Sequence, residues 1–527
     1  MRKPSSNNIL WFLILLFSFY YSIFSLESYA AEPLQDNFRA AVNQANFTGK
    51  TLQFYQKVNF RPIWFDGANW NHCAKEAIDR LAHAEREGLE PNDYRHILQN
   101  ALNAFEKGNF VKAELHLTKA FLRYIDDVRN GRFNPRLADR QLVVKPDPVD
   151  AVKILYQGSQ NQTCGWMNDL APHYFEYMAL KLLLAQYRQL AAVGPWPTLA
   201  TNVKLVPGET NSTVRTLREI LVRLGDLSSA HQNFESFDDT LRNALLAFQE
   251  RHGLEVDGKI GPKTLKALNT TPQQRIQQIT IAMERWRWMP RDPGERYIRV
   301  NIPEFALEAV ENRRVVLKSK IIIGMTYRET PVFTVNIRAV RFNPSWHIPR
   351  GIFVHDKLPK ILKDPSYIRK RGYVVTNSSG RRVNPSSVNW SSGAHGYRLR
   401  QTPGPKNALG KIRFTMPNRF NVYLHDTSQK QLFDKPVRTF SSGCIRVQKP
   451  VELALFVFND PIHWGRSVIE SEMKGYKTRN VTLSSKVPVH VTYFTTWVDE
   501  QKRPHFVADI YGQDRQVWNV LRRSHKK

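Results

Sequence analysis

The sequence predicts a multidomain α+β protein, with helical domains in its N-terminal part and a mostly β domain in its C-terminal part. Three observations predict this class. The 527 residues suffice for two to four domains with complete hydrophobic cores. Hydrophobic residues make up 42% of the chain and aromatic residues 11%, which is typical of globular protein. The hydrophobic period changes from that of a helix to that of a strand near residue 296.

Residues 1–30 have the pattern of an export signal. Two basic residues precede an apolar run at 9–24, and the sequence SYA at 28–30 has small residues at the positions that a signal peptidase reads. We therefore expect a cleavable signal peptide. An uncleaved anchor is the alternative, because residues 9–26 are just long enough to cross a bilayer. Either way, the rest of the chain is expected outside the inner membrane.

The formal net charge is +29, and removing residues 1–30, which hold two basic residues and one acidic residue, leaves +28. Such a charge in the cytoplasm would suggest nucleic acid as a partner. Outside the cytoplasm the polyanions are the cell wall and acidic lipid head groups. Because Lys and Arg are spread along the chain, we expect a generally basic surface and no nucleic-acid partner.

Residues 31–205 are expected to form a helical scaffold domain, because leucines recur at helical spacing up to the breaker sequence GPWP at 194–197. Residues 206–272 predict a small module of three short helices. Val214, Leu217 and Leu221 recur at helical spacing, and Gly261 precedes a proline where helices often begin. A helical connector is expected at 273–295.

The mostly β domain is expected at 296–514, where Ile298, Val300 and Ile302 alternate with polar residues. Residues 515–527 are expected to be a basic tail. Within the domain, residues of about 345–418 show few clear strands. An insertion of this length is typically a lid or a binding element.

Four side chains of the insertion are candidates for substrate contact. Trp390 and Tyr397 could pack against a sugar or a peptide, or belong to a small core of the insertion itself. Arg398 and Arg400 could neutralise carboxylates.

The sequence NVYLHDTSQKQLFDKPVRTFSSGCIRV predicts a nucleophile site. His425 lies nineteen positions before Cys444, which sits in a turn of small residues, Ser441, Ser442 and Gly443. A thiol attacks as a thiolate and therefore needs a base, which His425 can supply. The N–H groups of Gly443 and Cys444 could stabilise an oxyanion, which suits acyl transfer. The alternative is a structural thiol and a core histidine that takes no part in chemistry.

The three cysteines suggest one pair and one free thiol in an oxidising compartment. If Cys444 is the nucleophile, Cys73 and Cys164 remain as a candidate disulfide, although their separation in space is open. The sequence has no CxxC pair and no His/Cys cluster at metal spacing, so we expect no metal site.

The segment around Cys444 resembles the signature of the L,D-transpeptidase catalytic domain, the YkuD family. That signature is a His, some fifteen residues, then Ser/Thr-X-Gly-Cys-X-Asn/Arg, and Ser441, Gly443, Cys444 and Arg446 occupy its last part. The resemblance assigns the nucleophile to Cys444 and the general base to His425. Many members carry a second His where this chain has Ser442.

Three neighbouring residues are expected to orient the base or bind substrate. The backbone carbonyl or the side chain of Asp426 is the candidate that orients the imidazole. Arg446 could bind a substrate carboxylate or brace the turn. Tyr423 lies two positions before the base on the same predicted strand.

Other segments extend the resemblance. FYQKVNFRPIW and VRNGRFNP resemble the scaffold region of the large periplasmic L,D-transpeptidases of Gram-negative bacteria, and LRNALLAFQERHGLEVDGKIGPKTLKAL resembles a peptidoglycan-binding module. The insertion resembles the capping subdomain of the same enzymes. The resemblance implies a periplasmic location, peptidoglycan stem peptides as partners together with cell-wall synthesis enzymes, no cofactor, and acylation of Cys444 by carbapenems.

The implied reaction is a 3–3 cross-link between diaminopimelate residues of two stems, formed through a thioester on Cys444 with release of D-Ala. Water as acceptor would make an L,D-carboxypeptidase, and a lipoprotein lysine would make a tethering enzyme. A non-catalytic wall-binding protein and a secreted cysteine protease are alternatives of other classes.

Overall fold

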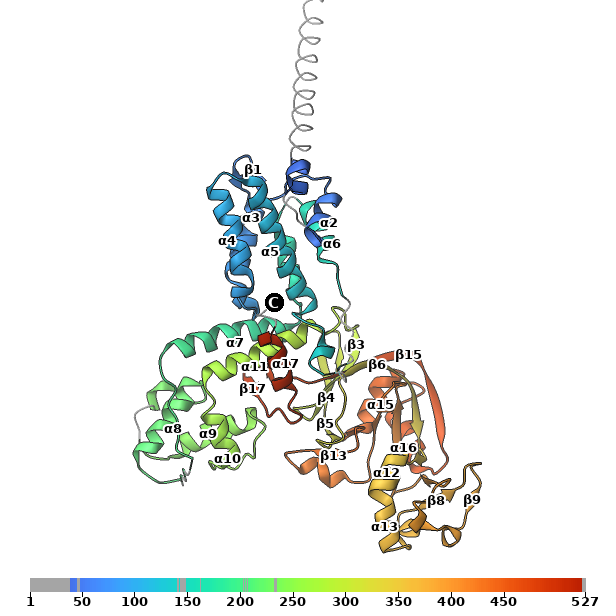
Figure 1. Ribbon diagram of the computed structural model, residues 1–527. Coiled ribbons are helices and arrows are strands. Elements are labelled where there is room, and N and C mark those ends of the chain that lie inside the picture. The colour runs from blue at the N-terminus through green and yellow to red at the C-terminus, as the bar shows by residue number, and fades with distance from the viewer. Residues whose placement is uncertain are drawn as a thin grey trace, which may run out of the picture. The chain divides into compact units, whose positions relative to one another are not determined.

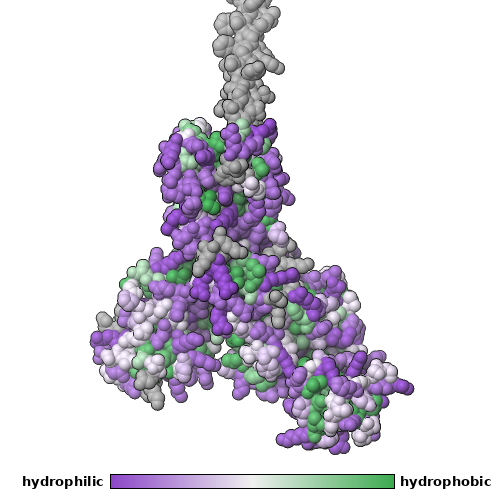
Figure 2. All heavy atoms as spheres, in the orientation of Figure 1, coloured by the Kyte–Doolittle hydropathy of each residue, from purple (hydrophilic) through white to green (hydrophobic). Residues whose placement is uncertain are grey.

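The computed structural model describes residues 38–44, 48–139, 142, 148–161, 163–201, 203, 205, 207–231 and 235–523 (Figure 1). The expected signal peptide at 1–30 lies outside these residues. Among the described residues, no helix is both long and apolar enough to span a membrane. The face drawn in Figure 2 is mostly hydrophilic, with hydrophobic residues in small groups. The combination of helices and strands confirms the predicted α+β class.

The chain divides into two compact units. The first runs to His173 without residues 133–146, and the second comprises those residues and the chain from Tyr174 onward. The expected scaffold boundary at residue 205 differs from this division. The helix α7 (Phe175–Ala192) belongs to the second unit, where it packs against α11 (Pro272–Arg287).

The first unit is helical. Its helices include α2 (Lys50–Lys57), α3 (His72–Ala82), α4 (Asn92–Glu106), α5 (Phe110–Asn130) and α6 (Ala151–Ser159), with a hairpin of β1 (Phe65–Asp66) and β2 (Asn69–Trp70) before α3. The long helix α5 begins where the Asn109 side chain accepts a hydrogen bond from the Lys112 N–H, and it ends at Gly131. Its buried face, which includes Leu117 and Phe121, lies in the core of the unit.

The second unit contains the three short helices that the sequence predicts, α8 (Ser212–Arg223), α9 (Asp239–Arg251) and α10 (Pro262–Leu268). The buried side chain of Gln249 organises the loop between the last two. Its amide donates to the Asp257 carboxylate at 2.9 Å and its carbonyl accepts from the Gly258 N–H at 2.8 Å. These contacts satisfy buried polar groups and need no ligand.

A nine-stranded sheet forms the body of the C-terminal domain. Its order is β13-β5-β14-β12-β11-β6-β15-β3-β4, and β4 also pairs with β5, so the sheet closes on itself. The strands are β3 (Arg296–Asn301), β4 (Ala306–Glu311), β5 (Arg314–Gly324), β6 (Phe333–Phe342), β11 (Ile412–Thr415), β12 (Leu424–His425), β13 (Thr439–Ser441), β14 (Ile445–Val447) and β15 (Arg479–Thr492). Side chains of one face, including Ile298, Val300 and Ile302, form the hydrophobic core.

The insertion between β6 and β11 is a small subdomain with its own sheet, which differs from the expectation of few strands. Its strands pair in the order β7-β10-β8-β9, from β7 (Trp346–His347), β10 (Arg398–Gln401), β8 (Tyr373–Thr376) and β9 (Arg382–Val383). Its helices are α12 (Arg350–Ile352), the π-helical turn η5 (Phe353–Lys357), α13 (Leu358–Lys363) and α14 (Tyr367–Lys370). The strands are short, and strong alternation is therefore missing from the sequence.

We expected a basic tail at 515–527, but the described residues of this segment, up to Arg523, form a helix. Residues up to Arg523 belong to helix α17 (Gln513–Arg523). Val517 and Leu521 are buried in the core of the second unit, and Asp514 pairs with Arg285 of α11. The basic residues at 515, 522 and 523 lie on the exposed side of an amphipathic helix, which is why the composition alone resembled a tail.

Candidate active site

The sheet register brings His425 on β12 beside β14, the strand that begins directly after Cys444. β12 and β14 are parallel, with Leu424 opposite Ile445 and His425 opposite Arg446. Leu424 and Ile445 are fully buried in the hydrophobic core. Because side chains alternate along a strand, His425 and Arg446 project from the opposite face, and Cys444 immediately before β14 is on that face as well.

The turn before Cys444 is held by hydrogen bonds among its own residues. Gly443 has φ +104°, a conformation that favours glycine, and its carbonyl accepts from Thr330 Oγ1 at 2.9 Å. Ser441 Oγ accepts from the Gly443 N–H at 3.1 Å and donates to the Cys444 carbonyl at 2.5 Å. The Gly443 N–H is therefore occupied in this conformation, contrary to its expected use for an oxyanion. Within the described chain, the Cys444 N–H makes no hydrogen bond.

His425 is oriented by the backbone carbonyls of Asp426 and Leu409. Its Nδ1 donates to the Asp426 carbonyl oxygen, which can only accept. Nδ1 therefore carries the proton and Nε2 keeps the lone pair that a general base needs. We expected either the backbone carbonyl or the side chain of Asp426 to orient the imidazole, and in the structure the backbone carbonyl contacts the ring. The Asp426 carboxylate accepts instead from the Lys411 N–H at 2.8 Å and pairs with Lys430.

Both candidate groups, the His425 imidazole and the Cys444 thiol, are uncharged at neutral pH. Burial, together with the charge of Arg446, lowers the pKa of His425 to about 3. Burial raises the pKa of the Cys444 thiol to about 11, although the Tyr423 N–H and the charges of Arg446 and Arg413 act in the opposite direction. The site thus contains a neutral imidazole and a neutral thiol. In such a site, attack by sulfur would require transfer of its proton to the imidazole during the reaction.

The other predicted residues of the turn have protein partners. Arg446 donates to Gln429 Oε1 at 2.8 Å, so it braces the neighbouring loop while its charge acts on Cys444. The exposed Ser442 hydroxyl accepts from Arg328 at 3.1 Å. The ring of Tyr423 lies 6.4 Å from the His425 ring, between centroids.

Two of the lid candidates pack within the insertion. Trp390 and Tyr397 lie against the insertion's own core, and the Trp390 indole donates to the Pro385 carbonyl at 3.0 Å. Arg398 is exposed and Arg400 is half-buried, and both charges act on His347. The two aromatic residues therefore match the alternative of a separate small core.

Sequence reasoning missed Arg413. It is opposite His425 in the antiparallel pairing of β11 and β12, and its guanidinium lies 4.9 Å from the Tyr423 ring centroid. The apolar residues Ile412 and Phe414 on either side of Arg413 were the only signal in the sequence, because they indicate a strand with Arg413 on its other face. Only the strand pairing shows that it stands beside the base.

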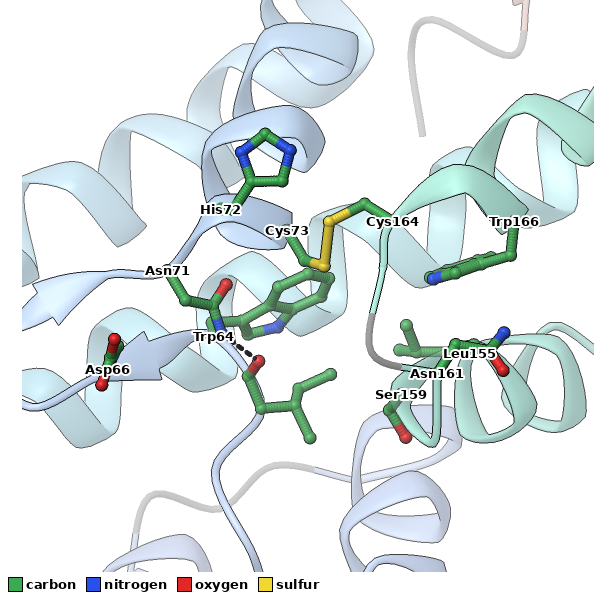
Figure 3. Close-up of a pocket in the computed structure, with 12 residues that line it drawn as sticks. Trp64, Asp66, Asn71, His72, Cys73, Leu155, Ser159, Asn161, Cys164 and Trp166 are labelled. Atoms are coloured by element: carbon green, nitrogen blue, oxygen red, sulfur yellow. Dashed lines mark hydrogen bonds between the residues drawn. A yellow bond between two sulfur atoms is a disulfide. The ribbon is translucent and has the colours of Figure 1, made fainter.

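The first unit holds a cavity of about 370 Å³ beside a disulfide between Cys73 and Cys164, whose Cα atoms are 5.3 Å apart (Figure 3). Asn71 at its wall donates to the Ile63 carbonyl at 2.8 Å. Cys444 is a free thiol. Among the described residues, no three His, Cys, Asp or Glu side chains are grouped so as to hold a metal ion.

Three segments of the chain match known domain families. Residues 49–184 match the Scaffold domain, residues 210–268 match the family described as "Putative peptidoglycan binding domain", and residues 295–462 match the L,D-transpeptidase catalytic domain, YkuD. The second unit therefore carries a YkuD L,D-transpeptidase catalytic domain, an acyltransferase domain, beside a domain of the peptidoglycan-binding type. The family resemblances of the sequence around Cys444 and of the three-helix module are confirmed.

A curated protein of Haemophilus influenzae, described as "Putative L,D-transpeptidase", is 32% identical to this chain over 255 residues. The alignment covers 47% of this chain and 51% of that protein, so the chain spans about half the length of the relative.

Two solved structures are also similar. An L,D-transpeptidase from Mycobacterium smegmatis is 13% identical, with 38% of this chain and 58% of that chain covered and a TM-score of 0.18. The L,D-transpeptidase from Xylanimonas cellulosilytica is 15% identical, and the match covers 57% of this chain and 100% of that chain with a TM-score of 0.18.

Proposed function

We propose that this protein is a peptidoglycan L,D-transpeptidase that acts in the periplasm and forms 3–3 links between diaminopimelate residues of two stem peptides. The observation that supports the proposal is the parallel register of β12 and β14, in which His425 lies on the same face of the sheet as Cys444, the residue before β14. The matching catalytic and peptidoglycan-binding domains support the substrate class.

In the first half-reaction, Cys444 Sγ attacks the carbonyl of the donor diaminopimelate while its proton moves to His425 Nε2. The tetrahedral oxyanion accepts a hydrogen bond from the Cys444 N–H. Collapse breaks the peptide bond, and the amine of the departing D-Ala takes the proton from the imidazolium. The enzyme is left with a thioester and a neutral His425.

In the second half-reaction, a side-chain amine of another stem attacks the thioester. His425 accepts a proton from this amine as the new amide bond forms, and the sulfur leaves and is reprotonated. Because thiol and imidazole provide the nucleophile and every proton transfer, the reaction as written uses no cofactor.

The test is mass spectrometry of the products from disaccharide-tetrapeptide, with the wild type beside Cys444→Ala. We expect a dimer that lacks one D-Ala and depends on Cys444, together with a transient acyl adduct on the wild-type protein. His425→Ala is expected to lose turnover. His463→Ala is the matched control, because His463 is an exposed histidine of the same domain.

Other products would change the assignment. A tripeptide monomer without dimer would identify an L,D-carboxypeptidase, and a product only with a lysine-containing lipoprotein would identify a tethering enzyme. Wall binding that persists in Cys444→Ala, with no turnover by the wild type, would identify a non-catalytic binding protein. The non-catalytic binding protein is tested as well because residues 210–268 match a putative peptidoglycan-binding domain.

A further inference from the structure

Basic side chains lie in register beside the catalytic base. In the pairing of β6 with β11, Arg341 is opposite Arg413, and in the pairing of β11 with β12, Arg413 is opposite His425. Ile412 and Val340 are fully buried in the core, so the two arginines project from the same face as His425. Adjacent strands are about 4.8 Å apart, which puts Arg413 one strand and Arg341 two strands from the base.

The insertion adds two more basic groups to this place. Arg400 on β10 is opposite His347 on β7. Burial lowers the pKa of His347, and the charges of Arg400, Arg341, Arg413 and Arg398 lower it further, so this imidazole lies in the field of all four guanidinium groups. Side chains from the nine-stranded sheet and from the insertion therefore converge.

Among the described residues, no carboxylate pairs with the arginines of this cluster. Arg341 donates to Asn480 at 3.3 Å and Arg400 to Ser345 at 3.5 Å. Arg413 donates to Thr415 at 3.4 Å and also hydrogen-bonds the Tyr423 side chain. Arg413 Nε is buried and has no hydrogen-bond partner within the described chain. None of these arginines forms an ion pair with a described carboxylate, whereas many arginines elsewhere in the second unit do.

Repulsion among converging cations is unfavourable unless an anion occupies the space between them. Planar guanidinium groups recognise carboxylates by paired, charge-assisted hydrogen bonds. Because Arg413 is also close enough to Cys444 for its charge to act on the thiol, the anion would lie near the attacked carbonyl.

We propose that Arg341, Arg413, Arg400 and His347 form a subsite for a free carboxylate of the peptide that acylates Cys444. This inference rests on the proposed function and names the part of the substrate that the site selects. Two carboxylates of a tetrapeptide stem are close to the attacked carbonyl, the C-terminal carboxylate of D-Ala and the side-chain carboxylate of diaminopimelate. Both present the same chemistry, and the experiment distinguishes them.

The test measures binding by calorimetry to full-length Cys444→Ala, which cannot turn the peptide over. Three tetrapeptide stems are compared: the free acid, the form with a C-terminal carboxamide, and the form with an amidated side-chain carboxylate. We expect one of the two amidated stems to bind about 10- to 100-fold more weakly than the free acid, because it loses a charge-assisted hydrogen-bonded pair with the arginines. That stem identifies the carboxylate.

Arg341→Gln and Arg400→Gln, each added to Cys444→Ala, test the residues. Both are expected to weaken binding of the free acid about tenfold or more and to leave binding of the discriminating amide unchanged. Arg382→Gln is the matched control, because Arg382 lies on β9, at the opposite edge of the insertion's sheet from β7. Thermal unfolding of each variant checks that it folds.

Equal losses for acid and amide stems, or no loss in either variant, would overturn the subsite. If the wild type cross-links all three stems at equal rates, the subsite is wrong while the proposed function stands. If no stem is bound or processed, both are wrong.

Discussion

Arg328 and Asp356 form a two-point ion pair, with Nη1 2.5 Å from Oδ2 and Nη2 2.9 Å from Oδ1. Arg328 follows β5, and Asp356 lies in the π-helical turn of the insertion. The same Nη1 donates to Ser442 Oγ, two residues before Cys444. One guanidinium thus connects the nucleophile turn to the insertion, at the position where many family members carry a second histidine.

Asp356→Asn is expected to loosen the insertion. Both side chains are partly exposed, so the loss is about 1 kcal/mol, equivalent to about fivefold more frequent local opening. Hydrogen exchange of amides in residues 345–411 would show it. Asp364→Asn is the control, because Asp364 pairs with Lys370 within the insertion and not with the catalytic turn. Equal exchange in the two variants would contradict a connection through Arg328.

The Cys444 thiol is expected to react slowly with a neutral alkylating reagent at neutral pH. Because its pKa is raised to about 11, the fraction of thiolate grows about tenfold for each pH unit below that value. Iodoacetamide labelling followed by mass spectrometry should rise steadily up to about pH 10. Cys444→Ala provides the blank, since Cys73 and Cys164 are joined. A rate that is already constant above about pH 8 would reveal a preformed thiolate.

Acidification is expected to destabilise the second unit. Burial lowers the pKa of His425 to about 3, that of His490 to about 4 and that of His252 well below its usual value. The unfolded chain binds protons near pH 6.5 and the folded chain does not, so stability is present above pH 6.5 and is lost as pH falls toward 4. The free energy of unfolding should fall by up to about 1.4 kcal/mol per pH unit for each histidine. Urea titrations followed by fluorescence measure it, and stability that rises on acidification would refute it.

Loss of the disulfide is expected to destabilise the first unit. The bond joins residues 91 positions apart, so it restricts a long loop of the unfolded chain. Cys73→Ser should lower the free energy of unfolding of this unit by about 2–4 kcal/mol. Calorimetry of the full chain measures the change, with Cys444→Ser as a matched loss of a thiol. Identical unfolding of wild type and Cys73→Ser would show that the bond contributes nothing.

Gly410→Ala is expected to disturb the base without removing it. A Cβ at this position would lie 2.3 Å from Asp426 Oδ2, and Asp426 holds His425 through its carbonyl. We expect acylation of Cys444 to slow about tenfold or more, because small shifts of a catalytic group have large effects. Gly396→Ala is the control, since it has a similar positive φ and no atom within 4 Å. Equal slowing in both variants would point to backbone strain as the cause.

The candidate pair of Cys444 and His425 stands out in the sequence because its signals are local. A histidine, a fixed spacing and a turn of small residues around Gly443 are visible along the chain, and the positive φ of Gly443 explains why glycine stands there. Arg413 carries no such signal, because an arginine between two buried residues is ordinary on any half-exposed strand. The contact of Arg328 with Ser442 joins residues 114 positions apart, beyond any local pattern.

The amino-acid order alone predicts the class of fold and the three-helix module, and it identifies Cys444 and His425 as candidates. These features depend on periodicity and on turns of a few residues. The tertiary structure decided the rest. In the tertiary structure, the Asp426 carbonyl contacts the His425 ring, and Trp390 and Tyr397 pack within the insertion. Arg341 and Arg413 lie on the strands beside His425. These relationships are set by strand register and by packing between distant segments, which no single stretch of sequence contains.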